Sequence, residues 1–214
     1  MVQGAIVRDR LRRETAEIHE RLHRHSGLGA AARGSITPWD YAQLLARLFG
    51  FHRAYESVLS ETACEEAIDP CFYAVARSES LALDLAALGL DRAAIARLPL
   101  CATIARPSNA AELLGARYVV EGSALGSQLI ARALEPSFGE NRRFFLSQPG
   151  NAWRVLTDLL ETLAGNPPAI EAAAGAARAI FLNFEMWMDG WKNPELFAIV
   201  GGEEGMELAP PAGR

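Results

Sequence analysis

Cysteine is scarce in this chain of 214 residues, and its few copies show no pairing pattern. Cys64, Cys71 and Cys101 are an odd set without a CxxC spacing, so a disulfide framework has no support. The first residues also lack the pattern of a secretory signal. Both absences favour a protein of the reducing cytoplasm.

Long apolar runs and an excess of positive charge are lacking as well. Arg, Glu or Asp interrupts the longest apolar stretches well before the roughly 20 residues that a membrane span needs. The net charge is −5, so no diffuse positive field is available to hold a nucleic-acid backbone or an anionic lipid surface. The sequence therefore predicts no transmembrane helix, no membrane partner and no nucleic-acid partner.

Motifs of side-chain catalysis are also missing. We find no paired catalytic carboxylates, no nucleophile elbow, no phosphate-binding glycine loop and no Ser/His/Asp order. Their absence argues against acid–base chemistry carried out by side chains. It fits a protein whose reaction is supplied by a bound cofactor.

Helical periodicity is what the sequence does contain. Leu11, Thr15, Ile18 and Leu22 recur on one face of a helix, which we expect over residues 7–25. The glycine-rich stretch that follows, residues 26–34, predicts a loop. Alternating runs bounded by hairpin turns are not evident, so the sequence predicts an all-α protein. Further helices are expected over residues 37–62 (capped by Thr37), 78–88, 108–134 (capped by Ser108), 153–163 and 168–191.

Composition and length favour one folded domain. Hydrophobic residues make up 50% of the chain and charged residues 22%, as in an ordinary globular protein. We expect a single helical domain over residues 1–200. Residues 201–214 are rich in Gly, Pro and charge without periodicity, and they predict a mobile C-terminal tail.

His19 lies on the edge of the inward face of the first predicted helix and can reach a buried cavity. A neutral imidazole there is a good ligand for iron, although spacing alone favours a half-buried histidine satisfied by hydrogen bonds. His23, four residues later, raises the possibility of a two-histidine metal site, but the HExxH pattern of a zinc hydrolase is absent. His25 and His52 are isolated and are predicted to be surface or packing residues.

A second constellation lies within the helix expected over residues 108–134. Gly122 and Gly126 each cost roughly 1 kcal/mol relative to alanine in a helix interior, and together they clear one face of side chains. Either another helix crosses closely there or a flat ligand lies against the bare backbone. Arg12, two turns before His19, and Arg154 could meet anionic groups of such a ligand.

Residues 11–19 (LRRETAEIH) and 118–126 (YVVEGSALG) resemble the proximal and distal helix motifs of the bacterial haem oxygenase family. The resemblance spans roughly residues 7–192 and implies a helical bundle that sandwiches haem between the two motifs. It implies that His19 is the proximal iron ligand and that Gly122 and Gly126 are the distal glycines. It also implies haem contacts from Arg12, Tyr118 and Arg154 to the propionates and from Phe181 as an aromatic packing residue.

The activity implied by this resemblance is the opening of the haem ring with O2 and electrons from a separate reductase of ferredoxin or flavoprotein type. The products are biliverdin, ferrous iron and carbon monoxide, and haem is both substrate and cofactor. Members of this kind are associated with bacterial phytochromes, so a bilin-binding photoreceptor is a further expected partner. Iron acquisition from haem is the other expected role, and the α isomer of biliverdin is the expected product.

Two positions depart from patterns known in the family. His23 stands where many members have an acidic residue, and Ser123 stands where animal enzymes have an aspartate. The Glu-Gly-Ser-x-Leu-Gly pattern of residues 121–126 is that of the bacterial branch, in which Ser123 could anchor a distal water. A non-catalytic haem-binding or haem-trafficking protein, with His23 perturbing the site, is the alternative function. A helical hydrolase would need a reactive cysteine or carboxylate pair, and the sequence shows no clear one.

Overall fold

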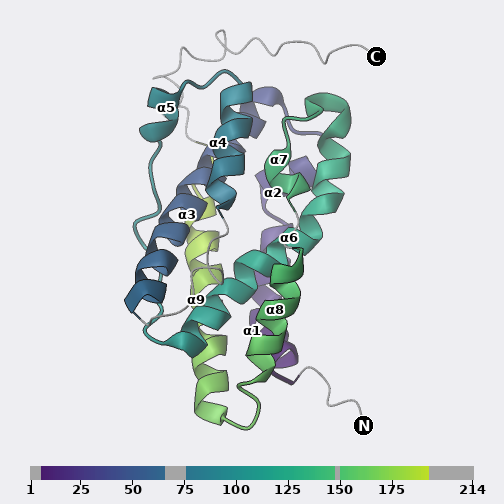
Figure 1. Cartoon of the computed structure of the whole chain (residues 1–214). Coiled ribbons are helices and arrows are strands. Elements are labelled where there is room, and N and C mark those ends of the chain that lie inside the picture. Colours follow the sequence, from purple (N-terminus) through teal and green to yellow (C-terminus); the bar gives the residue numbers. More distant parts are fainter. Residues whose placement is uncertain (1–5, 66–75, 148–149, 193–214) are drawn as a thin grey trace.

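Helices account for all the regular secondary structure that the structure describes, and the predicted all-α class is confirmed. The structure is a computed structural model in which residues 6–65, 76–147 and 150–192 are described. The predicted tail over residues 201–214 and Cys71 lie outside these ranges. The helices, shown in Figure 1, are α1 Ile6–His23, α2 Ser26–Ala32, α3 Pro38–Glu65, α4 Arg77–Ala87, α5 Arg92–Ala96, α6 Ala110–Phe138, α7 Arg143–Leu146, α8 Asn151–Glu161 and α9 Pro167–Met188.

All six predicted helices are present, as α1, α3, α4, α6, α8 and α9. Thr37 caps α3 as expected, because its hydroxyl accepts a hydrogen bond from the Asp40 backbone N–H at 3.1 Å. The predicted cap of α6 is wrong by one residue. Asn109 accepts the bond from the Glu112 N–H at 3.0 Å, while the Glu112 carboxylate reaches back to the Ser108 N–H at 2.7 Å. The helix therefore begins at Ala110, and Asn109 and Glu112 bond backbone N–H groups in opposite directions across its first turn.

The loop predicted for residues 26–34 is wrong, because most of this stretch forms α2. His25 caps it: Nδ1 accepts from the Leu28 N–H at 3.2 Å, and Nε2 is then the donor to the Met188 carbonyl at 3.1 Å. A Cβ at Gly27 would lie 3.0 Å from the ring of Trp191. Glycine is used here for close packing rather than for a turn. The short helices α5 and α7 were not predicted.

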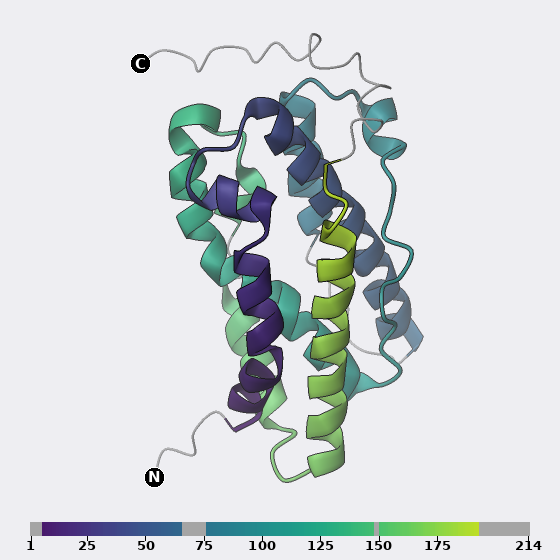
Figure 2. The same cartoon turned by 180° about the vertical axis from the view of Figure 1, so that it is seen from behind.

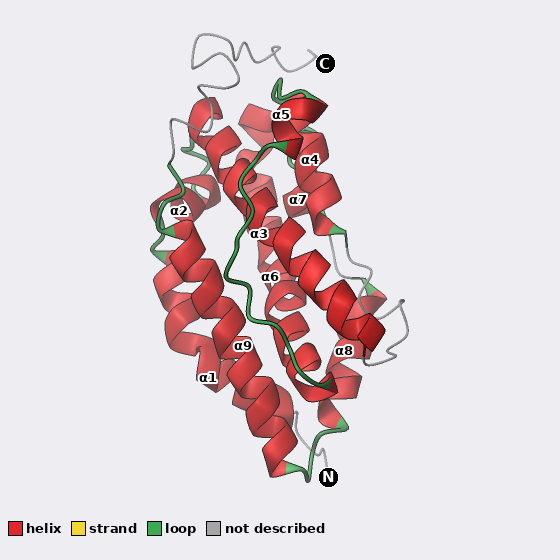
Figure 3. Ribbon diagram, turned by 90° about the vertical axis from the view of Figure 1, so that its left-hand side faces the viewer, coloured by secondary structure: helices red, strands yellow, loops and turns green. Residues whose placement is uncertain are grey.

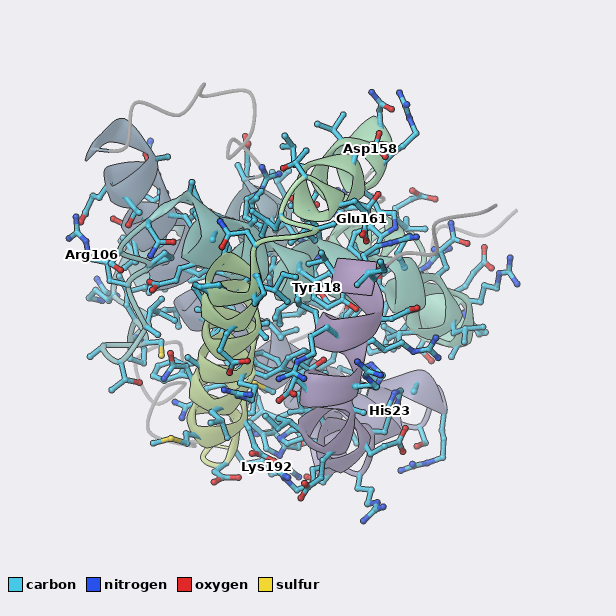
Figure 4. The ribbon with its side chains drawn as sticks, turned by 90° about the horizontal axis from the view of Figure 1, so that it is seen from below. His23, Arg106, Tyr118, Asp158, Glu161 and Lys192 are labelled. Atoms are coloured by element: carbon cyan, nitrogen blue, oxygen red, sulfur yellow. The ribbon has the colours of Figure 1, made fainter. Side chains whose placement is uncertain are left out.

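α1 and α9 lie side by side and run in the same direction (Figure 2). Three ion pairs join them, and the partners' numbers rise together along both helices. Arg10 lies 3.0 Å from Glu171, Glu14 pairs with Arg178, and Arg21 lies 2.6 Å from Glu185. The N-terminal end of α1 is held from α8, where the Glu161 carboxylate accepts bonds from the backbone N–H groups of Val7 and Arg8, both at 3.2 Å (Figure 4).

α6 also packs against α9, and this crossing is the closest approach between helix backbones at any glycine that the structure describes. A Cβ added at Gly115 would lie 2.0 Å from the Ala173 carbonyl oxygen. The facing residues of α9, Ala173, Ala174 and Ala177, are small and completely buried. Beyond this crossing α6 bends and continues along the other side of the molecule (Figure 1).

An extended strap, residues 97–109, connects α5 to α6 and runs over α3 and α9 (Figure 3). The Cys101 N–H bonds the Gly50 carbonyl at 3.1 Å, and the Ala105 N–H bonds the Asn183 side chain at 2.7 Å. A Cβ at Gly50 would lie 2.3 Å from the Pro99 carbonyl oxygen, so only glycine fits beneath the strap. The strap thereby fixes α3 and α9 relative to each other.

Buried apolar side chains form two separate clusters rather than one core. One gathers residues of α2, α4, α5, α7, the first half of α3 and the second half of α6, with Met188 at the end of α9. The other gathers residues of α1, α8, α9, the second half of α3 and the first half of α6. Phe184 and Trp187 of α9 pack against both. Among the described residues, no helix is long and apolar enough to cross a membrane.

We expect Gly115→Ala to lower the free energy of unfolding by about 1–3 kcal/mol or more, because its Cβ would force the α6 and α9 backbones apart. Gly175→Ala on α9 is the matched control, since its Cβ would meet only the Arg178 guanidinium, at 4.0 Å. That change should raise stability by up to about 1 kcal/mol through helix propensity. Urea denaturation of both variants measures the difference, and equal effects would contradict the proposed crossing.

Candidate functional site

A cavity of about 690 Å³ lies between the two buried clusters and is lined by both. Its size is that of a pocket for a sizeable organic ligand. α1 forms one wall and α6 another, and the two helices share few or no close contacts with each other. Figure 2 shows α6 crossing behind α1. The cavity therefore exists because both helices pack on α9 instead of on one another.

His19 lies on the α1 wall, as its spacing predicted, together with Arg12 and His23. Its ring lies perpendicular to that of Phe181, with centroids 6.1 Å apart, and perpendicular to that of His23, at 4.5 Å. Burial of part of the ring lowers the pKa of His19, and His23 lowers it further. The lowered pKa favours the neutral imidazole, which keeps a lone pair for a metal.

The α6 wall carries Gly122, Ser123 and Gly126. A Cβ at Gly126 would meet nothing within 4 Å, and one at Gly122 would lie 3.4 Å from the ring of Trp153, which is ordinary contact. No other helix backbone that the structure describes comes close to either glycine; the close crossing of α6 lies at Gly115 instead. Of the two interpretations left open by the sequence, the structure favours a ligand that lies against the bare backbone.

Arg12 and Tyr118 stand near each other at the cavity lining. Burial raises the pKa of the Tyr118 hydroxyl, while the nearby Arg12 charge opposes that rise. The Tyr118 ring packs on Trp153 with centroids 5.7 Å apart, and Figure 4 shows Tyr118 beside α1. Arg154 is not among the lining residues: it is exposed, bonds Asn151 at 3.0 Å and lies 3.8 Å from Asp158. The predicted haem contact of Arg154 therefore gains no support.

Arg77 is a cavity residue that the sequence analysis missed. It is buried, and its Nη1 donates to the Val120 carbonyl at 3.1 Å and to the Ser123 hydroxyl at 3.2 Å. Its guanidinium also lies over the ring of Phe144, 4.3 Å from the centroid. Burial lowers the pKa of Arg77 to about 10. Nothing in the local sequence distinguishes this arginine, because its partners lie on α6 and α7.

His52, predicted to be a surface or packing residue, packs between aromatic rings and also lines the cavity. Its side chain is buried, and Nδ1 has no hydrogen-bond partner among the described residues. Burial, and then the charge of Arg77, hold the pKa of His52 well below its ordinary value. Its spacing of four from the buried Leu48 was the available sign that it faces inward.

We expect the buried His52 to make the protein less stable in acid. Because the pKa of His52 is lowered in the folded state, this side chain binds a proton below about pH 6.5 in the unfolded chain but stays neutral in the folded one. This group alone then removes up to about 1.4 kcal/mol of unfolding free energy per pH unit below that value. Urea denaturation between pH 7.5 and 5 should show a shallower loss in His52→Leu; the same slope in both proteins would contradict the assignment.

Together these features define the class: an all-α protein with a large, mostly apolar cavity that has a histidine on one wall and bare helix backbone on another. The family comparison agrees with that class. The sequence model of the haem oxygenase family matches residues 7–189, and the chain belongs to this family. The search of curated proteins found no match. The resemblance of the two helix motifs is thereby confirmed at the level of the family.

Proposed function

We propose that this protein is a haem oxygenase that opens the haem ring to biliverdin, ferrous iron and carbon monoxide. The observation that carries the proposal is that His19 of α1 and the unobstructed backbone at Gly126 of α6 face the same cavity. Membership of the haem oxygenase family supports it. The activity of this chain, the site residues and the finer assignment to the bacterial branch belong to the proposal.

The residues present fit haem. The ligand is flat, largely apolar and anionic at one edge, and the cavity offers apolar walls such as Phe181 and Phe184 with Arg12 at its lining. The lowered pKa of His19 favours the neutral imidazole, whose ring nitrogen is a good ligand for the iron. We propose Arg12 and Tyr118 as the groups that hold the propionates and so fix the rotation of the ring in its plane.

Haem bound here supplies the iron that activates O2 and the ring that is opened. Residues of α6 would then control access to the haem, and the position of water, at the face opposite His19. Gly122 and Gly126 leave the backbone free to approach. The Ser123 hydroxyl donates to the Val120 carbonyl at 2.7 Å and accepts from Arg77, so its second lone pair can hold a water in the cavity. Arg77 thus acts as a positioning residue for Ser123.

Partners and regiochemistry complete the proposal. Electrons come from a separate reductase of ferredoxin or flavoprotein type, and we expect the α isomer of biliverdin. The Glu-Gly-Ser-x-Leu-Gly pattern of residues 121–126 supports a bacterial type of enzyme whose product supplies a bilin-binding photoreceptor, with iron acquisition as the other role. Cysteine usage supports a cytoplasmic location.

Purified protein mixed with haem, O2 and a reductant should lose the haem absorption band and gain a bilin band. Chromatography against isomer standards should identify the α isomer. Haem that stays intact after many reducing equivalents would overturn the proposed activity.

Gly126→Leu should keep the stability of the haem-free protein, because the added side chain begins in open space. It should lower the rate of bilin formation at least tenfold, because the side chain fills the cavity. Gly175→Ala serves as the control outside the cavity.

A non-catalytic haem-binding protein is the second candidate, because the ring of His23 lies only 4.5 Å from that of His19 and could take its place. In our proposal His19→Ala abolishes the absorption spectrum of histidine-ligated haem, and added imidazole restores it. His23→Ala retains that spectrum. Loss of the ligand in His23→Ala alone would show that the other histidine binds the iron, and the assignment of His19 would then be wrong.

A further inference from the structure

Three metal-ligating side chains meet on α1 at the cavity lining: His19, Glu20 and His23. Their donor atoms all lie within 4.8 Å of one another. The two histidines are one helical turn apart, and Glu20 lies between them in the sequence. All three side chains reach solvent, and only the His19 ring also contacts Phe181, so small rotations of the side chains disturb little packing. Donor atoms bound to one ion at about 2.1 Å lie about 3 Å apart, which small rotations would achieve.

Glu20 differs from the other glutamates of this helix. Glu14 is paired with Arg10 and Arg178, and Glu17 is paired with Arg21 at 3.0 Å. No ion pair holds the Glu20 carboxylate among the described residues. Its carboxylate faces the two imidazoles instead, and is close enough to act on the charge of His19. Coordination of a cation by Glu20 therefore breaks no ion pair that stabilises α1.

Two imidazoles and one carboxylate are the ligand set of many non-haem iron(II) sites, in which the remaining positions hold water or substrate. We propose that His19, Glu20 and His23 bind a divalent transition-metal ion when no haem occupies the cavity, and that its natural occupant is the ferrous iron freed by ring opening. The assignment of ferrous iron as the natural occupant rests on the proposed function. The iron remains ferrous, and the step exchanges ligands only: Glu20 and His23 replace water or bilin nitrogen atoms while His19 stays bound.

The metal site is tested on haem-free protein with Co²⁺ alone, a spectroscopic probe with ligand preferences close to those of Fe²⁺. We expect one Co²⁺ per chain by calorimetry, with visible absorption from nitrogen and oxygen ligands. His23→Gln and Glu20→Gln should each weaken binding at least about tenfold. Glu17→Gln, which removes an exposed carboxylate on the same helix, should leave it unchanged. Protein already loaded with haem should not bind Co²⁺ at this site, because His19 is shared.

Two outcomes of this titration overturn the site: no Co²⁺ binding by the unaltered protein, or equal binding by the unaltered protein and both Gln variants. The measurement needs no haem turnover, so it can fail or succeed independently of the proposed activity.

The assignment of ferrous iron as the occupant is tested after haem turnover by adding a chromophoric ferrous chelator. His23→Gln should give up its iron at least several times faster than Glu17→Gln does. Equal release rates, with bilin formed in both, would exclude ferrous iron as the occupant.

Discussion

The packing of α9 against both α1 and α6 determines the positions of the two cavity walls that carry His19 and the glycines. At Gly115 the backbones of α6 and α9 meet at a separation that excludes even a methyl group, and along α1 three ion pairs keep α9 in parallel register. α1 and α6 are thus each fixed to α9 without filling the space between themselves. α9 itself contributes Phe181 and Phe184 to the lining. The shape of the cavity follows from contacts made mostly outside it.

Features set by local spacing could be predicted from the sequence. The apolar face of α1 fixed the side on which His19 and Arg12 lie, since residues three and four apart share a helix face. The cost of glycine inside a helix indicated that Gly122 and Gly126 serve a purpose other than helix formation. The resemblance of the two motifs to the haem oxygenase family, to which the chain belongs, joined these local signals into one predicted site. Periodicity alone favoured a purely structural role for His19, and it left a close helix crossing at Gly122 and Gly126 as open as a ligand site.

Features that depend on distant partners could not be predicted. α2 forms because Trp191 packs on Gly27 and because His25 bonds to Met188, and both partners lie near the end of α9. Arg77 enters the site only through its bonds to α6, and its sequence neighbours give no sign of it. Arg154 shows the converse case: this cation, plausible from the sequence, bonds residues of its own helix and is not among the cavity-lining residues, so its predicted role gains no support.

The two separate apolar clusters have a consequence for the energetics of the whole molecule. An apolar ligand between them would convert two half-cores into one continuous interior, so its binding energy is at the same time folding energy. In the proposed reaction the substrate would then serve as a temporary structural component, and the protein would be at its most rigid just before it destroys that component. Each completed turnover would return the chain to its loosest state, and product release and mechanical softening would become the same event.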